Sequence, residues 1–158
     1  AGEREGTDAY IIACFGDPGL YAARELTRAP VIGIAEAAFH VASLISTRFS
    51  VVTTLPRTLI IAEHLLDNYG FRHSCRRLRA ADIPVLDLEE NPDIALERII
   101  DECLKAKRED NIGAIVLGCG GMAASSPSST SSSTSPLTST MSGHPSRSVS
   151  NVWVPHPT

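Results

Sequence analysis

The chain has 158 residues, of which 43% are hydrophobic and 20% charged, and its formal net charge is −4. A negative net charge argues against nucleic acid or an anionic membrane as the main partner. No apolar run approaches the roughly 18 residues of a membrane span, and residues 1–9 are polar, so we expect neither a membrane anchor nor a secretory signal. Four cysteines without a C-x-x-C pair or a zinc spacing favour reduced thiols, no bound metal and a cytoplasmic protein.

Apolar runs and helical patterns alternate from the start of the chain. Residues 9–14 predict a strand, and Asp17 as N-cap with Pro18 at the first helical position predicts a helix to about residue 28. Residues 29–34 predict a second strand, and a helix is expected over about residues 36–46. The first third of the chain is therefore expected to alternate strand, helix, strand and helix.

The middle of the chain continues this alternation. Residues 48–55 predict a third strand, and Pro56 begins a helix that Gly70 is expected to end in the left-handed conformation. The arginine-rich stretch 72–79 predicts a loop or strand edge whose arginines form a solvated face rather than an anion site. Residues 83–88 predict the fourth strand because they form the next short apolar run.

The last predicted helix and strand complete the pattern. Asn91 and Pro92 predict the start of a helix, and residues 113–119 predict the fifth strand. The apolar stripe expected on that helix consists of Leu96, Ile99, Ile100 and Cys103. Continuous apolar strands that alternate with amphipathic helices indicate an α/β fold with a parallel sheet covered on both faces. In such sheets the working site lies at the carboxyl ends of the strands.

The composition changes abruptly after residue 124. Ser or Thr occupies 13 of the 16 positions from 125 to 140, and no acidic residue occurs from there to the end of the sequence. Such a segment offers too little apolar surface to offset the conformational entropy lost on ordering. We therefore predict that residues 125–158 are a disordered tail.

Two of the four cysteines share an unusual setting. Cys14 and Cys119 each end an apolar run and precede a glycine-containing turn, whereas Cys103 is expected in the core and Cys75 in a loop or strand edge. Backbone N–H groups of such turns favour a thiolate. Two thiols in matching settings favour racemisation at a carbon acid, in which one removes a proton and the other returns one to the opposite face. A redox disulfide is the weaker alternative, because the turns are typical of anion cradles.

Four stretches of the sequence together resemble a known family. The stretches "CFGDPGL", "PVIGIAEAA", "RFSVVTTLPRT" and "AIVLGCGGMA" are similar to the hydantoin and allantoin racemases of the aspartate/glutamate racemase superfamily, and the similarity runs from about Asp8 to Ala123. It implies a two-lobed parallel-sheet racemase fold, with one lobe nearly complete and the other partial. On this interpretation a first-lobe remnant occupies residues 1–29, the second lobe occupies 30–124 and the tail occupies 125–158.

The resemblance also implies the site. Cys14 and Cys119 are expected to be the catalytic acid and base that face the substrate from the two lobes. The residues expected around the hydantoin ring are Phe15, Gly16, Glu36, Thr53, Thr54, Gly118 and Gly120. The family implies a small-molecule substrate, no metal or organic cofactor, and a homo-oligomer in its intact members.

The sequence thus predicts cofactor-independent racemisation at C5 of a 5-substituted hydantoin or of allantoin, and two alternatives remain open. The first is another isomerase or a decarboxylase of the same superfamily, which would act on substrates with free carboxylates. The second is an inactive truncated or frameshifted product. The family's first strand with its asparagine-containing loop does not occur before Cys14, and the Ser/Thr-rich segment begins directly after "GCGGMA".

Overall fold

The computed structural model describes residues 6–84, 86–123 and 152–153, and its strands form two separate sheets. In chain order the elements are β1 (Tyr10–Ile12), α1 (Leu20–Leu26), β2 (Val31–Gly33), α2 (Ile34–Ile45), β3 (Phe49–Thr53), the 3₁₀ helix η2 (Pro56–Thr58), α3 (Leu59–Asn68), β4 (Cys75–Ala80), α4 (Asp87–Glu90), α5 (Pro92–Glu109), β5 (Ala114–Leu117), the 3₁₀ helix η3 (Gly120–Ala123) and β6 (Val152–Trp153). Strands β1 and β2 pair in parallel, and the other four follow the order β4-β3-β5-β6. None of the described helices is long and apolar enough to cross a membrane.

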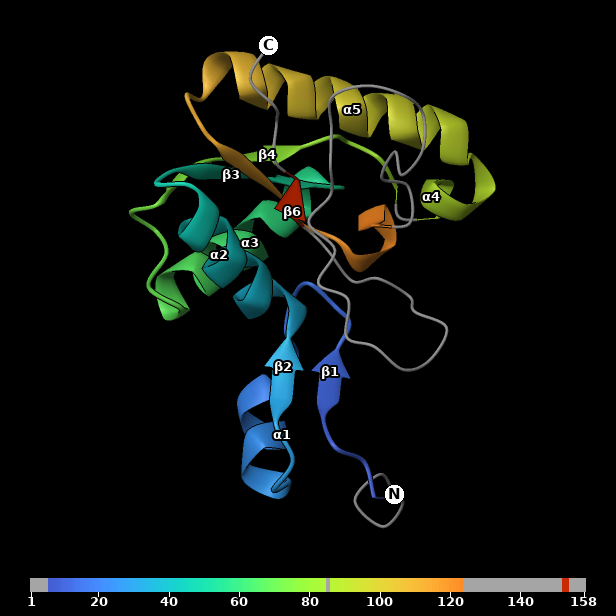
Figure 1. Cartoon of the computed structure of the whole chain (residues 1–158). Helices are drawn as coiled ribbons and strands as arrows, with labels where there is room; N and C mark the ends of the chain where they lie inside the picture. The colour runs from blue at the N-terminus through green and yellow to red at the C-terminus, as the bar shows by residue number, and fades with distance from the viewer. Residues whose placement is uncertain (1–5, 85, 124–151, 154–158) are drawn as a thin grey trace.

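The four-stranded sheet carries the core of the molecule. Strand β3 pairs in parallel with β4 and β5, and every residue of β3 and β5 is buried. Helices α2 and α3 pack on the face that includes Val51 and Val116, whereas α5 packs on the face that includes Val52 and Ile115. Figure 1 shows α5 above this sheet, α2 and α3 below it, and the two-stranded sheet with α1 projecting beyond them. The predicted α/β fold with a parallel sheet covered on both faces is confirmed.

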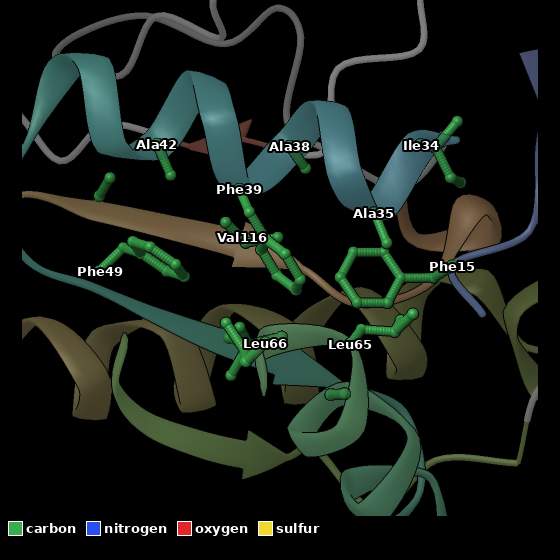
Figure 2. Close-up of a cluster of buried hydrophobic side chains, with 13 residues drawn as sticks. Phe15, Ile34, Ala35, Ala38, Phe39, Ala42, Phe49, Leu65, Leu66 and Val116 are labelled. Carbon is green, nitrogen blue, oxygen red and sulfur yellow. The ribbon is translucent and has the colours of Figure 1, made fainter. Parts of the chain in front are cut away.

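An aromatic cluster joins the two sheets. Phe39 of α2 is fully buried, stacks on Phe49 of β3 at a centroid distance of 5.8 Å, and meets Phe15 edge-to-face at 5.7 Å. Figure 2 shows Phe15 pointing into this cluster beside Ala35 and Leu65. Phe15 lies in the turn that follows β1, so its burial fastens that turn to the helices of the larger sheet. Such aromatic pairs contribute about 0.5–1.5 kcal/mol beyond their area burial.

The prediction of a strand at residues 83–88 is wrong. The corresponding strand is β4, Cys75–Ala80, in the arginine-rich stretch where the sequence predicted a loop or strand edge. Because β4 lies at the edge of the sheet, most of its side chains are exposed or half-buried and an apolar run is not required. Ile83 is buried in the loop beyond β4, where its N–H donates to the Thr54 carbonyl, and helix α4 begins at Asp87.

Arg79 does not lie on a solvated face, which corrects the prediction for this arginine. Its side chain is only 8% exposed and donates to Asp110 at 2.7 and 2.8 Å, to Glu102 at 2.9 Å and to Glu109 at 2.7 Å. Burial by itself would raise the pKa of Asp110, but hydrogen bonds from Arg79 and Ser50 hold that pKa below its usual value. The other three arginines of the stretch are exposed, as predicted. The buried arginine thus joins edge strand β4 to the end of α5.

Helix α1 begins later than the sequence predicts. Its first residue is Leu20, and its N-cap is Gly19 in the left-handed conformation, so Asp17 and Pro18 do not begin this helix. The carboxylate of Asp17 instead accepts hydrogen bonds from the first residues of α2. The cap signal in "GDPG" is therefore real, but it serves the next helix along the chain.

Other helix predictions hold closely. Helix α5 begins at Pro92 with Asn91 as its N-cap, and Gly70 follows α3 in the left-handed conformation, with φ of 76°. The stripe on α5 is shifted, because Ile99 and Cys103 are buried whereas Ile100 is exposed. The residues that α5 buries are Ala95, Ile99, Cys103 and Ala106.

The boundary between the two sheets falls within a strand–helix junction. Strand β2 pairs with β1, and α2 begins at Ile34 directly after the last residue of β2, so the two sheets meet at Gly33. Of the predicted tail, only Val152–Trp153 lies within the described residues. These two residues form β6, which pairs antiparallel with β5.

Candidate active site

The turn after β1 carries Cys14, and its thiol is exposed. The N–H of Asp17 donates to the Cys14 carbonyl at 2.9 Å and closes this turn. The next residue, Phe15, is buried in the aromatic cluster. The turn therefore presents the thiol outward while its neighbour anchors it inward.

The turn after β5 carries Cys119, which is half-buried against the residues packed on α5. The N–H of Gly118 donates to the Val52 carbonyl at 2.7 Å, which continues the pairing of β5 with β3. The N–H of Met122 donates to the Cys119 carbonyl at 3.1 Å and begins η3. Backbone hydrogen bonds on both sides thus fix the position of Cys119.

The two cysteine-bearing turns meet. A Cβ placed on Gly120 would lie 3.1 Å from the carbonyl oxygen of Ala13 and 3.7 Å from Cδ1 of Ile34. Ala13 precedes Cys14 and Gly120 follows Cys119 in sequence. Only glycine fits this approach without displacing its neighbour. The structure therefore brings together the two turns that the sequence singled out.

The threonines at the end of β3 are buried, and Thr53 packs against the Cys119 turn. The Thr53 hydroxyl donates to the Gly118 carbonyl at 3.2 Å and shares a 2.8 Å hydrogen bond with the Thr58 hydroxyl. A Cβ on Gly118 would lie 3.0 Å from Cβ of Thr53, so the two residues are tightly packed. Thr54 offers its carbonyl to the N–H of Ile83. Thr53 and Gly118 thus support the turn, and the N–H of Gly118 is already committed to the sheet.

Two further expected ring contacts have structural partners. Glu36 lies in the first turn of α2 and forms a 2.5 Å ion pair with Arg24 of α1. Arg24 also donates to the Val31 carbonyl at 3.1 Å, so this pair fastens α1 to the junction between β2 and α2. Gly16 is half-buried, and a Cβ on it would come no closer than 3.9 Å to Ile61.

The remaining two cysteines, Cys75 and Cys103, have raised thiol pKa values, and all four cysteines are free. Burial raises the pKa of the Cys103 thiol to about 12, and burial likewise raises the pKa of Cys75 to about 12. Both thiols therefore stay protonated near neutral pH, where a thiolate base would be required. Among the described residues, no group of three or more His, Cys, Asp or Glu side chains is placed to hold a metal ion.

Sequence reasoning missed the role of Asp17 at this site. Its carboxylate reaches α2 and the hydroxyl of Tyr69 at the end of α3, across separations of 18 to 52 residues. The signal that could have revealed it is Gly33, a glycine at the point where a strand passes directly into a helix. Such a residue indicates a close approach by another group.

Comparison with known proteins gives consistent matches. Residues 1–144 match the family profile Asp/Glu/Hydantoin racemase. The chain is 57% identical over 121 residues to a hydantoin racemase of Rhizobium meliloti, covering 77% of this chain and 50% of that protein. It is 50% identical over 122 residues to a hydantoin racemase of Pseudomonas sp., covering 77% of this chain and 49% of that protein.

Solved structures of allantoin racemases are also similar to this chain. The enzyme from Klebsiella pneumoniae matches with a TM-score of 0.75 and 61% identity, covering 77% of this chain and 49% of that chain. The enzyme from Pseudomonas fluorescens matches with a TM-score of 0.70 and 43% identity, covering 73% of this chain and 49% of that chain. The chain spans about half the length of the curated relatives that it matches.

Proposed function

The chain belongs to the Asp/Glu/hydantoin racemase family, and on this basis we propose that the protein racemises a hydantoin-type ring at C5 with Cys14 and Cys119 as acid and base. The observation that carries the proposal is the contact between the two cysteine-bearing turns, where Gly120 lies against the carbonyl of Ala13. The relatives are named for hydantoin and for allantoin. Allantoin is itself a hydantoin with a ureido group at C5, so the shared ring defines the substrate class.

The chemistry needs only a proton donor and a proton acceptor. The C5–H bond is acidic because the neighbouring C4 carbonyl accepts the electron pair as an enolate. A thiolate on one face removes the C5 proton, and a thiol on the opposite face gives its proton to C5. The product is the mirror image of the substrate, and the two cysteines have exchanged protonation states. The reverse reaction then uses the same residues in opposite roles, so no oxidant or cofactor enters the balance.

The four cysteines divide in a way that supports this assignment. Cys75 and Cys103 have pKa values raised to about 12 by burial, which removes them as bases near neutrality. Cys14 is exposed and Cys119 is half-buried. They also follow β1 and β5 at the carboxyl ends, where α/β sheets place their sites.

The other expected site residues take two kinds of role in this proposal. Thr53, Gly118 and Glu36 hold the surrounding turns through the contacts described above. Phe15 anchors the Cys14 turn through the aromatic cluster. The groups proposed to contact the ring are the backbones of Gly16 and Gly120, whereas Thr54 is buried and holds the loop beyond β4 through its carbonyl. The proposal keeps the sequence-based expectations of a cytoplasmic location, a small-molecule substrate and a homo-oligomer in the intact family members.

The test places this chain in a full-length setting. The matching segment of the Klebsiella pneumoniae allantoin racemase, which is 61% identical, is replaced by this sequence. We expect the chimera to racemise enantiopure allantoin or a 5-substituted hydantoin, and the loss of optical rotation measures this reaction. We expect Cys14→Ser to abolish racemisation and Cys75→Ser, the matched control, to preserve it.

Two results would contradict the proposal. Deuterium incorporation from D₂O into aspartate or glutamate, with none into hydantoins, would assign the chain to another reaction of the superfamily. Unchanged racemisation by the Cys14→Ser chimera would exclude the two-thiol chemistry even if the substrate class is right. Differential scanning fluorimetry of each chimera shows whether it is folded before activity is interpreted.

A further inference from the structure

We propose that Asp17 is the positioning residue for Cys14, because its carboxylate fastens the Cys14 turn to the N-terminus of α2, which also contacts the Cys119 turn. Asp17 has no expected role in binding the ring or moving the proton. The catalytic meaning of this inference rests on the proposed function, whereas its structural part stands on contacts alone.

The carboxylate of Asp17 is buried and fully engaged. Asp17 is only 5% exposed, and its Oδ1 accepts a hydrogen bond from the N–H of Ala35 at 3.1 Å. Its Oδ2 accepts from the N–H of Glu36 at 2.9 Å and from the hydroxyl of Tyr69 at 2.9 Å. N–H groups in the first turn of a helix are favourable partners for a carboxylate, because they lack partners within the helix and lie at the positive end of its dipole. One side chain thus joins the β1–α1 turn to α2 and to the end of α3.

The backbone and its surroundings are adapted to this carboxylate. Asp17 has φ of 43°, in the left-handed region that non-glycine residues seldom occupy. A Cβ on Gly33 would lie 2.4 Å from Cγ of Asp17, so the carboxylate occupies the space that any larger residue at position 33 would need. An uncommon backbone conformation persists where the surrounding contacts over-determine it, and these contacts are the three hydrogen bonds.

Both cysteine-bearing turns are in contact with the start of α2. On one side, the N–H of Asp17 donates to the Cys14 carbonyl, so a displacement of Asp17 displaces the Cys14 turn. On the other side, Cδ1 of Ile34, the first residue of α2, would lie 3.7 Å from a Cβ on Gly120, next to Cys119. The N-terminus of α2 therefore positions both cysteine-bearing turns relative to each other, and Asp17 makes the connection to the Cys14 turn.

Loss of the carboxylate is expected to affect the two thiols unequally. In Asp17→Asn the single side-chain oxygen can take the place of Oδ2 and keep two of the hydrogen bonds, but the amide nitrogen at the other position cannot accept the third. The Cys14 turn then loosens, whereas the Cys119 turn keeps its backbone bonds to β3. A misplacement of about 1 Å at a reacting group can lower a rate by roughly 100-fold.

The structural part is tested by hydrogen–deuterium exchange on the 158-residue chain. We expect Asp17→Asn to speed exchange of amides in residues 14–20 and 34–38 by about tenfold or more, while residues 114–119 keep their rates. Asp110→Asn is the matched control, because it removes a buried carboxylate that Arg79 and Ser50 bind at the C-terminal end of α5, away from α2. This control is expected to leave residues 14–20 unchanged. Equal acceleration throughout the chain, or none in residues 14–20, would overturn the inference.

The catalytic part is tested in the chimera by following C5 deuteration of each hydantoin enantiomer in D₂O. Asp17→Asn is expected to slow racemisation by about 10- to 100-fold. It should preserve exchange of the enantiomer that Cys119 deprotonates and reduce exchange of the other. Tyr69→Phe, which leaves both bonds to α2 in place, should have a smaller effect. An equal loss for both enantiomers would reduce Asp17 to a structural residue. An inactive parent chimera would refute the proposed function and leave the exchange result on Asp17 standing.

Discussion

Cys119 follows a strand that is buried along its whole length between two other strands, whereas Cys14 follows a strand of the two-stranded sheet in which Ile11 is 58% exposed. The Cys119 turn is held by backbone hydrogen bonds from Gly118 and Met122. The Cys14 turn is closed by one backbone bond from the N–H of Asp17, and it is fastened to the rest of the molecule by side chains, namely the carboxylate of Asp17 and the ring of Phe15. A turn held by the backbone bonds of a sheet keeps its position after most single substitutions, whereas a turn that depends on one carboxylate can lose its position when that one residue is replaced.

The largest expected effect removes the core that both turns share. Phe39→Ala should lower the free energy of unfolding by about 3–5 kcal/mol, because the ring is fully buried among Phe15 and Phe49. Urea denaturation measures this loss. Leu44→Ala on the same helix is the control, since Leu44 is 84% exposed, and it should change stability by less than about 0.5 kcal/mol. Similar losses for the two variants would show that the aromatic cluster does not carry the fold.

A smaller effect is expected when only the Cys14 side is disturbed. Gly33→Ala should destabilise by about 1–3 kcal/mol, because the new methyl group would meet the Asp17 carboxylate at 2.4 Å. Its hydrogen-exchange pattern should resemble that of Asp17→Asn. Gly16→Ala is the control, since its methyl group would find no atom closer than 3.9 Å. If Gly33→Ala left residues 14–20 protected, the carboxylate would not be held as described.

A third substitution sharpens the comparison at the contact between the turns. Gly120→Ala should cost under about 1 kcal/mol, because the Ala13 carbonyl at 3.1 Å must move by only a few tenths of an ångström. Racemisation by the chimera should nevertheless fall by about tenfold, since the two thiols move apart. A rate within twofold of the parent would mean that this contact does not set the thiol separation.

The smallest expected effect is a dependence on alkaline pH. Burial and the hydrogen bond to Asp17 raise the pKa of Tyr69 above its usual value of 10. The folded state thus favours the protonated phenol, and this stabilisation is complete below pH 10 and is lost as the pH rises further. When the pH is raised from 8 to 11, the free energy of unfolding, measured by urea denaturation, should therefore fall less for Tyr69→Phe than for the parent chain. An equal fall in the free energy of unfolding for both proteins would show that ionisation of Tyr69 does not destabilise the folded state.

Much of the fold could be predicted because its central strands are buried on both faces. Strands β3 and β5 read as apolar runs, and α5 begins at an Asn–Pro signal. Strand β4 could not be found in this way, because an edge strand needs no apolar run. Its one buried arginine is paired with the carboxylates of Glu102 in α5 and of Asp110 directly after it. The carboxylates that pair with this arginine are distant in sequence, so the sequence alone predicts a solvated side chain.

The candidate site shows the same division. Cys14 and Cys119 could be singled out because each follows a strand and precedes glycines, which are local patterns. The role of Asp17 could not, because a "GDPG" turn usually caps the helix that follows it, and the actual partners begin 18 residues away. Local signals identified the reactive groups, whereas the contacts that place them depend on tertiary structure.

The most direct test of the two-thiol account is deuterium exchange at C5 of each separate hydantoin enantiomer, catalysed by Cys14→Ser and Cys119→Ser chimeras. With one thiol left, a proton can be removed and returned on one face only, so the account predicts that both variants lose racemisation. Each variant should still exchange one enantiomer, and the two variants should exchange opposite enantiomers. Continued racemisation by either variant, or exchange of the same enantiomer by both, would contradict the assignment of Cys14 and Cys119 to opposite faces of the ring.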